Sequence, residues 1–471
     1  MSYTRRIAHN TIIQIIGKSV STVIGVVVIG MLTRYLGQGG FGQYTTIMAF
    51  LQFFGVVVDL GLYVILVKKI SEANADEEKL VSNIFTLRLV SAIIFLGLAP
   101  VGVWFFPYPD IVRWGVLITS FSFLGITLNQ ALAGVFQKHL RMDKVVIAEV
   151  VGRLMLIGIT YYVIRAELGL LWIMGSVVAG SLVNFIVTYI LSRSLVRFRL
   201  RFNWPVWKDV IKDSWPIALS IAFNLVYFKA DTIILSLYYN ADTVGIYGAA
   251  YKVLEVFNTL PAMFAGLVLP LLAAAWASLD RERFKRVLQK AFDAMILIAV
   301  PLAIGTLFLA RPVMDLVAPD FIDSARVLQI LIFAASIIFI GNLFGNTVVA
   351  INKQKTMMWL YLLVAVVSLI GYLILIPRYS YFGAAGMTVA SELLITISAA
   401  LVVYWGTRIL PSLTVLLKSL LASAVMAGVL YFISDFSIFV SILISVVVYL
   451  LVMYIIKGIR KETLTEIIRL K

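Results

Sequence analysis

The sequence contains no cysteine and only two histidines, His9 and His139. Without cysteine the chain has no disulfide bond and no thiolate nucleophile or ligand. Two isolated histidines do not suggest a metal centre, because protein metal sites gather several nitrogen or sulfur ligands. We therefore expect no metal ion and no bound cofactor.

Charged residues are also scarce. Only 13% of the 471 residues are charged, 62% are hydrophobic, and the mean hydropathy is +1.00. Such a chain has too little polar surface for a water-soluble protein. The composition excludes a soluble enzyme and predicts an all-α, polytopic membrane protein.

Long apolar segments run from one end of the chain to the other. A helix needs about 20 apolar residues to cross a bilayer core. We expect about 14 such spans, at residues 11–33, 41–66, 81–105, 111–136, 145–164, 168–191, 215–238, 245–276, 291–310, 327–350, 357–376, 383–405, 413–433 and 436–456. No small-residue cleavage site of the A-x-A kind precedes the turn at 34–42, so the first span is interpreted as a retained helix.

Basic residues gather on one side of these spans. Of the 39 lysines and arginines, 28 lie in the loops, tails and adjoining span ends that share a side with the N-terminus. Short basic loops stay in the cytoplasm, so both termini are expected there, in a multi-pass protein of the cell (inner, cytoplasmic) membrane. The charges are dispersed among short loops, which argues for contact with membrane lipids and against nucleic-acid binding.

Catalytic motifs are missing from the loops. There is no D-x-D motif and no Ser/His/Asp arrangement, and the one acidic run outside the spans is 76–78. A membrane glycosyltransferase or polymerase would need a larger extramembrane site. We expect a transporter and no enzyme.

The chain repeats itself weakly at an offset of 203 residues. Leu32, Tyr35, Gly42 and Tyr44 correspond to Leu235, Tyr238, Gly245 and Tyr247. An even number of spans per copy predicts parallel repeats, with two six-helix lobes, 1–200 and 201–410, around a central cavity, followed by two further helices in 411–471. Chance similarity between apolar helices is the alternative.

The connection between the predicted lobes alternates in character. In the segment 197–202, arginine at every second position is separated by an apolar residue. An extended or interfacial segment of this kind could bury one side and present the other to anionic lipid. Simple retention of positive charge on the cytoplasmic side explains the pattern equally well.

Several motifs resemble those of a known family. The segments TRYLGQGGFGQY (33–44), DLGL (59–62), VKKI (67–70), KADTIIL (229–235) and VGIYGAAYKVLE (244–255) are similar to Wzx-type polysaccharide flippases. These belong to the multidrug, oligosaccharidyl-lipid and polysaccharide exporter superfamily. The resemblance implies outward flipping of a polyprenyl-diphosphate-linked oligosaccharide by alternating access, for cell-surface polysaccharide biosynthesis. Glycosyltransferases and a polysaccharide polymerase would then be partners.

Charges at membrane depth are candidate functional residues, because each costs about 2.5–3.5 kcal/mol to insert. In the first span Lys18 belongs to a polar stripe with Gln14, which favours a water-filled cavity; snorkelling to the surface is the alternative. Arg88 either faces the cytoplasmic mouth or snorkels. Glu149 and Arg153, four residues apart, are expected to form a structural pair.

The seventh and eighth spans hold the other candidates. Asn224 and Asp231 share a helix face with Tyr227 beside them, whereas Lys229 points about 160° away from Asp231 on an ideal helix. In the eighth span Lys252 and Glu255 are close enough to pair. Asp59 and Glu392 lie near predicted span ends or bends, where structural contacts are the simpler interpretation.

A diphosphate brings about two negative charges, which ammonium and guanidinium groups hold well at low dielectric. The residues predicted to bind substrate are Gln14, Lys18, Arg88, Asn224, Tyr227, Lys229, Tyr251 and Lys252, and those predicted to couple an ion are Asp59, Asp231 and Glu255. Coupling to a proton or a sodium gradient stays open.

Three alternatives compete with this prediction. A MurJ-like lipid II flippase usually carries more arginines on its cavity helices than the first two spans offer here. A MATE-like small-molecule exporter would need a more acidic set of embedded residues. A non-transporting membrane assembly factor would tolerate neutralisation of the embedded charges.

Overall fold

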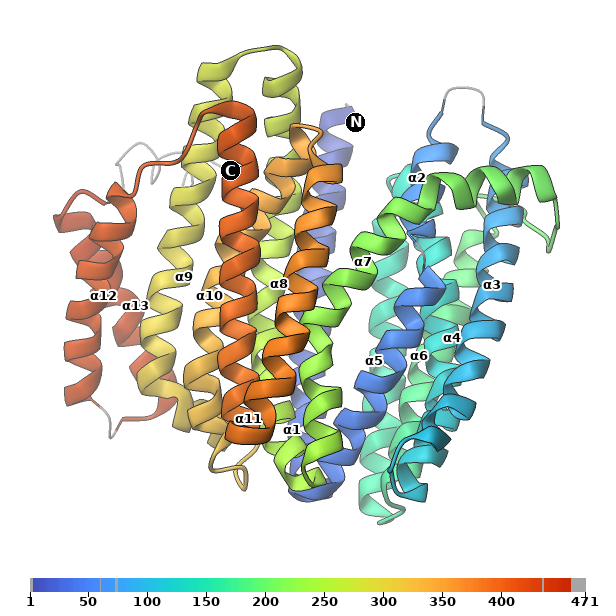
Figure 1. Cartoon of the computed structure of the whole chain (residues 1–471), viewed down its shortest axis with the longest axis horizontal. Coiled ribbons are helices and arrows are strands. Elements are labelled where there is room, and N and C mark those ends of the chain that lie inside the picture. Colours follow the sequence, from blue (N-terminus) through green and yellow to red (C-terminus); the bar gives the residue numbers. More distant parts are fainter. Residues whose placement is uncertain (1–2, 60, 73–74, 434–435, 459–471) are drawn as a thin grey trace. The chain divides into compact units, whose positions relative to one another are not determined.

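The chain is all helical, as its composition predicts. The computed structural model describes residues 3–59, 61–72, 75–433 and 436–458, and over these it forms helices and no strand (Figure 1). The chain divides into two compact units, Met1–Gly248 and Ala249–Lys471. The lobe boundaries expected from the repeat stay a prediction.

The first unit contains seven helices and the start of an eighth, all within the described residues. These are α1 Tyr3–Asp59, α2 Leu62–Ile70, α3 Glu77–Gly102, α4 Asp110–Lys138, α5 Met142–Arg165, α6 Leu170–Ser192, α7 Trp204–Tyr238 and α8 Ala241–Ala277, with a short 3-10 helix, Val103–Phe105, after α3. The second unit continues α8 and adds α9 Arg281–Val317, α10 Ser324–Ala350, α11 Gln354–Thr407, α12 Thr414–Phe432 and α13 Ile438–Ile455.

Twelve helices of the described chain are long and apolar enough to cross a membrane. Two of these segments, of 55 and 54 residues, have more than twice the length that one crossing needs. Their backbones are interrupted at Gly37, where φ is 63°, and at Ser380, where φ is 54°. After Ser380 the second part of α11 folds back along the first part. The hydroxyl groups of Ser368 and Ser391, one from each part, lie 2.7 Å apart. The expected count of 14 spans stays a prediction.

Side-chain caps fix the beginnings of three helices. The Asp76 carboxylate accepts a hydrogen bond of 3.0 Å from the Lys79 N–H at the start of α3. Asn203 caps α7 and Asp280 caps α9 in the same way, at 3.3 and 2.8 Å. Each cap satisfies one of the backbone N–H groups that a helix leaves free at its start.

Helices α1 and α8 cross at very short range. A Cβ atom added to Gly42 would overlap the carbonyl oxygen of Ala241, and one added to Gly245 would overlap the carbonyl oxygen of Gln38. Only glycine permits this approach of two backbones, as at other close helix crossings in membranes. The two contacts are equivalent, since 241 and 245 are 38 and 42 shifted by 203.

The same offset relates the neighbouring contacts. A Cβ on Gly39 would lie 3.0 Å from an oxygen of Asp242, and a Cβ on Gly248 would lie 2.6 Å from the Thr45 hydroxyl. Residues that contact their own repeat equivalents are what a local two-fold axis produces. The crossing therefore supports the internal repeat that the sequence suggested from four identities.

The start of α7 closes one end of the first unit. Trp207 and Val210 are buried in a hydrophobic cluster with α2 and α3, whose other buried members are Leu62, Ile65, Leu66, Ile70, Val81, Ile84, Leu87, Val135 and Val196. In Figure 1 this part of α7 runs across the ends of α2 and α3 before the helix turns along the bundle. The cluster anchors a helical segment that carries too many charges to cross a bilayer.

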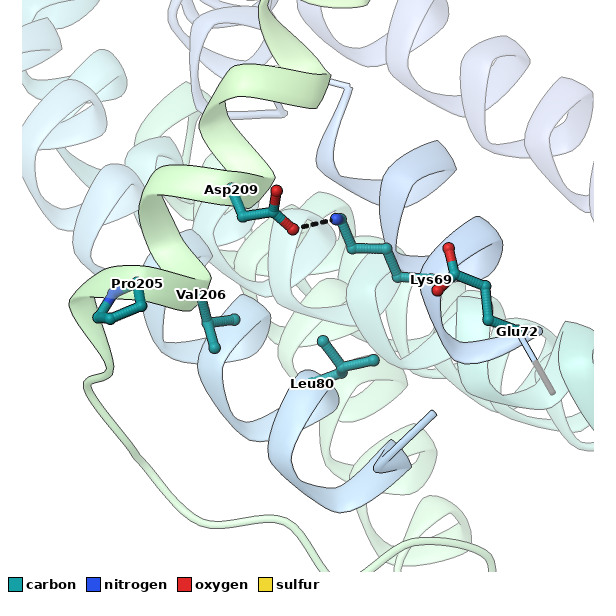
Figure 2. Close-up of a pocket in the computed structure, with 6 residues that line it drawn as sticks. All are labelled: Lys69, Glu72, Leu80, Pro205, Val206 and Asp209. Carbon is teal, nitrogen blue, oxygen red and sulfur yellow. Dashed lines mark hydrogen bonds and ion pairs between the residues drawn. The ribbon is translucent and has the colours of Figure 1, made fainter. Parts of the chain in front are cut away.

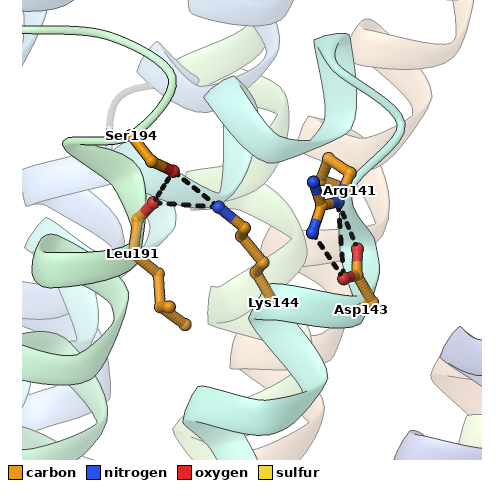
Figure 3. Close-up of polar contacts among 5 residues, drawn as sticks. All are labelled: Arg141, Asp143, Lys144, Leu191 and Ser194. Carbon is orange, nitrogen blue, oxygen red and sulfur yellow. Dashed lines mark hydrogen bonds and ion pairs between the residues drawn. The ribbon is translucent and has the colours of Figure 1, made fainter.

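Basic residues at the same end also make structural contacts (Figure 3). Arg141 holds the carboxylate of Asp143 with two parallel hydrogen bonds of 3.0 Å. Lys144 donates to the Ser194 hydroxyl at 2.6 Å and to the Leu191 carbonyl oxygen at 3.3 Å. A lysine at the carboxyl end of α6 also complements the helix dipole.

In the second unit, α12 and α13 pack against α9. The buried side chains of this cluster are Ala422, Met426, Leu430, Tyr449 and Met453. Gln289 on α9 binds the backbone of Ser412 twice, donating to its carbonyl oxygen at 3.2 Å and accepting from its N–H at 2.6 Å. These bonds fix the connection that enters α12.

Membrane orientation can be tested with single cysteines, because the natural chain has none to interfere. Cysteines at Phe105 and Tyr379, which are 86% and 60% exposed, should react with an impermeant reagent added outside intact cells. Cysteines at Ala75 and Leu279 should be protected until the membrane is permeabilised, because basic loops mark the cytoplasmic side. Reversed labelling would overturn the predicted orientation of both termini.

Candidate functional site

Asp231 is the most deeply buried of the predicted site residues on α7. Its side chain is fully buried and accepts a hydrogen bond of 2.5 Å from the hydroxyl of Tyr247 on α8. The Thr232 N–H and hydroxyl also donate to it, at 2.5 and 3.1 Å. Donors on Tyr247 and Thr232 thus surround this embedded carboxylate, and hydrogen bonds of this kind stabilise a buried polar group.

The sequence did not predict that Tyr247 binds Asp231. Tyr247 is completely buried and is the repeat equivalent of Tyr44, which is 6% exposed. That correspondence was visible in the sequence, so the repeat contained a signal for Tyr247. The hydrogen bond to Asp231 was not visible, because it depends on how α7 and α8 pack.

The other predicted residues of α7 surround Asp231 in sequence. The Asn224 amide donates to the Tyr227 hydroxyl at 2.7 Å, so these two residues do share a face. The Lys229 ammonium is buried and lies 5.5 Å from the centre of the Phe228 ring. A cation over an aromatic face is stabilised there at membrane depth.

Lys18 lies on α1 with its side chain 47% exposed, and its ammonium is 3.9 Å from the Glu149 carboxylate on α5. The expected pair of Glu149 with Arg153 is wrong, because the partner of Glu149 comes from α1. Arg153 instead lies near α1 at Gly25, where an added Cβ would be 3.7 Å from its guanidinium. Gln14, one turn before Lys18, is half-buried.

Arg88 forms a buried cluster with Asp59 and Gln130. Its side chain is fully buried, forms an ion pair with Asp59 at the end of α1, and donates at 2.6 Å to Gln130 on α4. The sequence predicted that Arg88 faces the cytoplasmic mouth or snorkels to the surface. Both expectations are wrong, because its side chain is fully buried. Its Nε and Nη1 atoms have no hydrogen-bond partner within the described part of the chain.

The second unit contains the predicted pair on α8. The Lys252 ammonium is 2.8 Å from the Glu255 carboxylate, and the two side chains are 22% and 30% exposed, so this prediction is confirmed. Tyr251, the adjacent substrate-binding candidate, is 3% exposed. Because the two side chains carry opposite charges, the net charge of the pair is zero.

Glu392 was predicted to lie near a span end or bend and was not proposed as a site residue. In the structure it lies within the second arm of α11 and is 5% exposed. The neighbouring Ser391 is hydrogen-bonded to Ser368. A carboxyl group at this depth is rare in membrane helices and usually functional.

The family of the chain follows from comparisons with known proteins. A family model described as "Polysaccharide biosynthesis protein" matches residues 7–276, more than half of the chain. The chain belongs to this family. The match confirms the resemblance to Wzx-type polysaccharide flippases that the sequence motifs carry. A second family model, MatE, matches residues 216–374.

Curated relatives of this family member agree with that assignment. A putative O-antigen transporter of Shigella dysenteriae is 23% identical over 379 residues, which cover 77% of this chain and 91% of that protein. The capsular polysaccharide biosynthesis protein CapF of Staphylococcus aureus is 22% identical over 350 residues, covering 73% and 88%.

Solved structures share the fold of this family member. The lipid II flippase MurJ in an inward closed conformation matches with a TM-score of 0.76 and 16% identity, over 94% of this chain and 98% of that one. An inward-facing multidrug resistance MATE family transporter matches with a TM-score of 0.68 and 13% identity, over 82% and 94%. Identities this low show a common architecture alone.

Proposed function

We propose that this protein flips a polyprenyl-diphosphate-linked oligosaccharide from the cytoplasmic to the outer leaflet by alternating access. The observation that carries the proposal is membership of the polysaccharide biosynthesis family, together with relatives named as an O-antigen transporter and a capsular polysaccharide biosynthesis protein. Cytoplasmic glycosyltransferases would supply the substrate, and a polysaccharide polymerase would consume it.

The embedded cations have the chemistry that the substrate requires. Lys18, Lys229 and Lys252 are ammonium groups at membrane depth, and a diphosphate is held there by charge-assisted hydrogen bonds. Gln14, Asn224, Tyr227 and Tyr251 supply hydroxyl and amide groups for sugars. Asp231 and Glu255 are the proposed ion-coupling carboxylates. Arg88 and Asp59 are better explained as a structural pair, because each neutralises the other.

Reconstituted flipping tests the proposal directly. The full chain in vesicles should move a fluorescent polyprenyl-diphosphate oligosaccharide between leaflets, which is measured by the fraction accessible to an impermeant reductant. Empty vesicles and heat-inactivated protein are the controls. No protein-dependent flipping of any polyprenyl-diphosphate glycan would contradict the proposal.

A MATE-like exporter is the second candidate, favoured by the MatE match over residues 216–374. The same vesicles distinguish the two functions. Efflux of a small organic cation without any flipping of the lipid-linked glycan would select the exporter.

The crossing of α1 and α8 offers a test of alternating access. Cysteines at Gly39 and Asp242 should form a disulfide bond, because a Cβ on Gly39 would lie 3.0 Å from an oxygen of the Asp242 side chain. If the crossing must open during the cycle, the bridged protein should lose at least about nine-tenths of its flipping, and a reductant should restore it. Each single cysteine variant is the control. Full flipping with the bridge intact would show that this crossing stays closed.

A further inference from the structure

The linker between α6 and α7 is fixed along α3. The Arg199 N–H donates to the Ser82 hydroxyl at 3.2 Å, and the Arg201 N–H donates to the Thr86 hydroxyl at 3.0 Å. Ser82 and Thr86 are one helical turn apart, so the two bonds hold the linker backbone against one face of α3. The Phe198 ring also packs against Phe85 of α3, with 4.9 Å between the two ring centres.

Beyond the linker, the start of α7 has two unlike faces. Trp207 and Val210 are buried against α2 and α3. Trp204, Ile211 and Trp215 recur at helical spacing on another side of the helix and are 58%, 41% and 52% exposed. Leu200 and Phe202 of the linker are also exposed, at 64% and 68%, and we call these five apolar side chains, which the described protein does not cover, the apolar row.

The charges of this segment are sorted between the two faces. Asp209 and Asp213 both bind Lys69 at the end of α2, and Figure 2 shows the first of these pairs beside a cavity of about 360 Å³. The hydrogen bond from Lys69 holds the pKa of the Asp213 carboxyl below its usual value. Both acids therefore share one cation of the protein, Lys69, whereas Lys208 and Lys212 are exposed.

Five cations of residues 197–215 have no ion-pair partner among the described residues. They are Arg197, Arg199, Arg201, Lys208 and Lys212, and all are exposed. Arg141, Lys144 and Lys69 at the same end of the unit have protein partners. These five cations lie in the same stretch of chain, residues 197–215, as the apolar row.

We propose that this surface docks on anionic phospholipid headgroups at the membrane interface. We call it the linker face and define it as Arg197, Arg199, Leu200, Arg201, Phe202, Trp204, Lys208, Ile211, Lys212 and Trp215. The cations complement anionic headgroups, and exposed tryptophans between them are typical of the membrane interface. An acidic soluble partner would satisfy the charges alone, whereas a lipid surface also buries the apolar row.

The position of the linker face agrees with this occupant. The linker joins α6, a candidate span that ends at Ser192, to the candidate span Ile221–Tyr238, so it cannot leave the neighbourhood of the bilayer. Docking would keep the linker at headgroup level. This inference goes beyond the proposed transport function and does not depend on it.

The test measures which lipids surround the linker face in the full chain. A fluorophore on Leu200→Cys is quenched, in phosphatidylcholine vesicles, by nitroxide lipids with either a phosphatidylglycerol or a phosphatidylcholine headgroup. We expect the phosphatidylglycerol form to associate at least about fivefold more strongly, the factor that one basic residue near the surface contributes. Added salt should weaken this preference. Equal quenching by both headgroups would overturn the proposal.

A charge-matched pair of variants gives the control. Arg197→Gln, Arg199→Gln and Arg201→Gln together should abolish the preference. Arg281→Gln, Arg283→Gln and Arg286→Gln, which remove three exposed cations from the second unit, should leave it intact. Retention of the preference by the linker variant would refute the assignment.

A polyprenyl diphosphate shares its chemistry with the phospholipid headgroup, so a further arm separates the two. Adding 1 mol% polyprenyl diphosphate should leave quenching by phosphatidylglycerol unchanged if the linker face binds the bulk lipid surface. Complete recovery of fluorescence would instead identify a site for the transported lipid and overturn phospholipid docking.

Discussion

Replacing Asp59 by Asn is expected to destabilise the first unit by about 3–5 kcal/mol, the usual effect of removing one partner from a buried ion pair. Arg88 would keep its charge with no exposed atom, because its side chain is fully buried and its remaining bond is to Gln130. Denaturant unfolding of the purified protein in detergent measures the change. The amount of folded protein recovered from membranes should fall with it.

The double variant Arg88→Met, Asp59→Leu is the matched control. It removes both charges, so it should be considerably more stable than Asp59→Asn alone, since an apolar pair of similar volume is tolerated where a single buried charge is not. If Asp59→Asn unfolds like the unmodified protein, the pair does not stabilise this fold. If the folded double variant flips substrate without responding to an ion gradient, Asp59 has a coupling role that its pairing conceals.

The membrane architecture was predictable because the bilayer restricts it strongly. Long apolar segments can hardly become anything other than spanning helices, so the fold class followed from composition alone. The start of α7 was missed for the same reason. Residues 204–214 are too polar for a span, and their helix is stabilised by an Asn203 cap and by the burial of Trp207 on α2 and α3.

Contacts within one helix were also predictable, whereas contacts between helices were not. Lys252 and Glu255 pair because helical spacing brings them together. Glu149 had an equally good local partner in Arg153, yet Lys18 from another helix lies at salt-bridge distance. The Arg88 cluster joins α1, α3 and α4, and sequence spacing holds no information about such packing. The weak repeat was the exception, since its offset of 203 matched real contacts between α1 and α8.

Asp231→Asn is expected to slow gradient-driven flipping by about 10- to 100-fold, because it weakens charge-assisted hydrogen bonds worth about 1.5–3 kcal/mol each. The fully buried carboxylate is held by Tyr247 and Thr232, so it need not touch the glycolipid in the loaded state. Binding of the lipid-linked oligosaccharide should therefore change much less than turnover. Flipping should also lose most of its dependence on an imposed proton or sodium gradient.

Tyr247→Phe separates the charge of Asp231 from its packing. This variant removes one donor, at 2.5 Å, and leaves the carboxylate in place, so turnover should fall while the response to the gradient persists.

Lys18→Ala and Lys252→Ala should weaken binding of the diphosphate-linked substrate instead, and Lys18→Arg should be largely tolerated if a simple cation suffices. Unmodified flipping by a correctly inserted Lys18→Ala, Lys252→Ala, Asp231→Asn variant would refute the proposed site residues while leaving the family assignment in place.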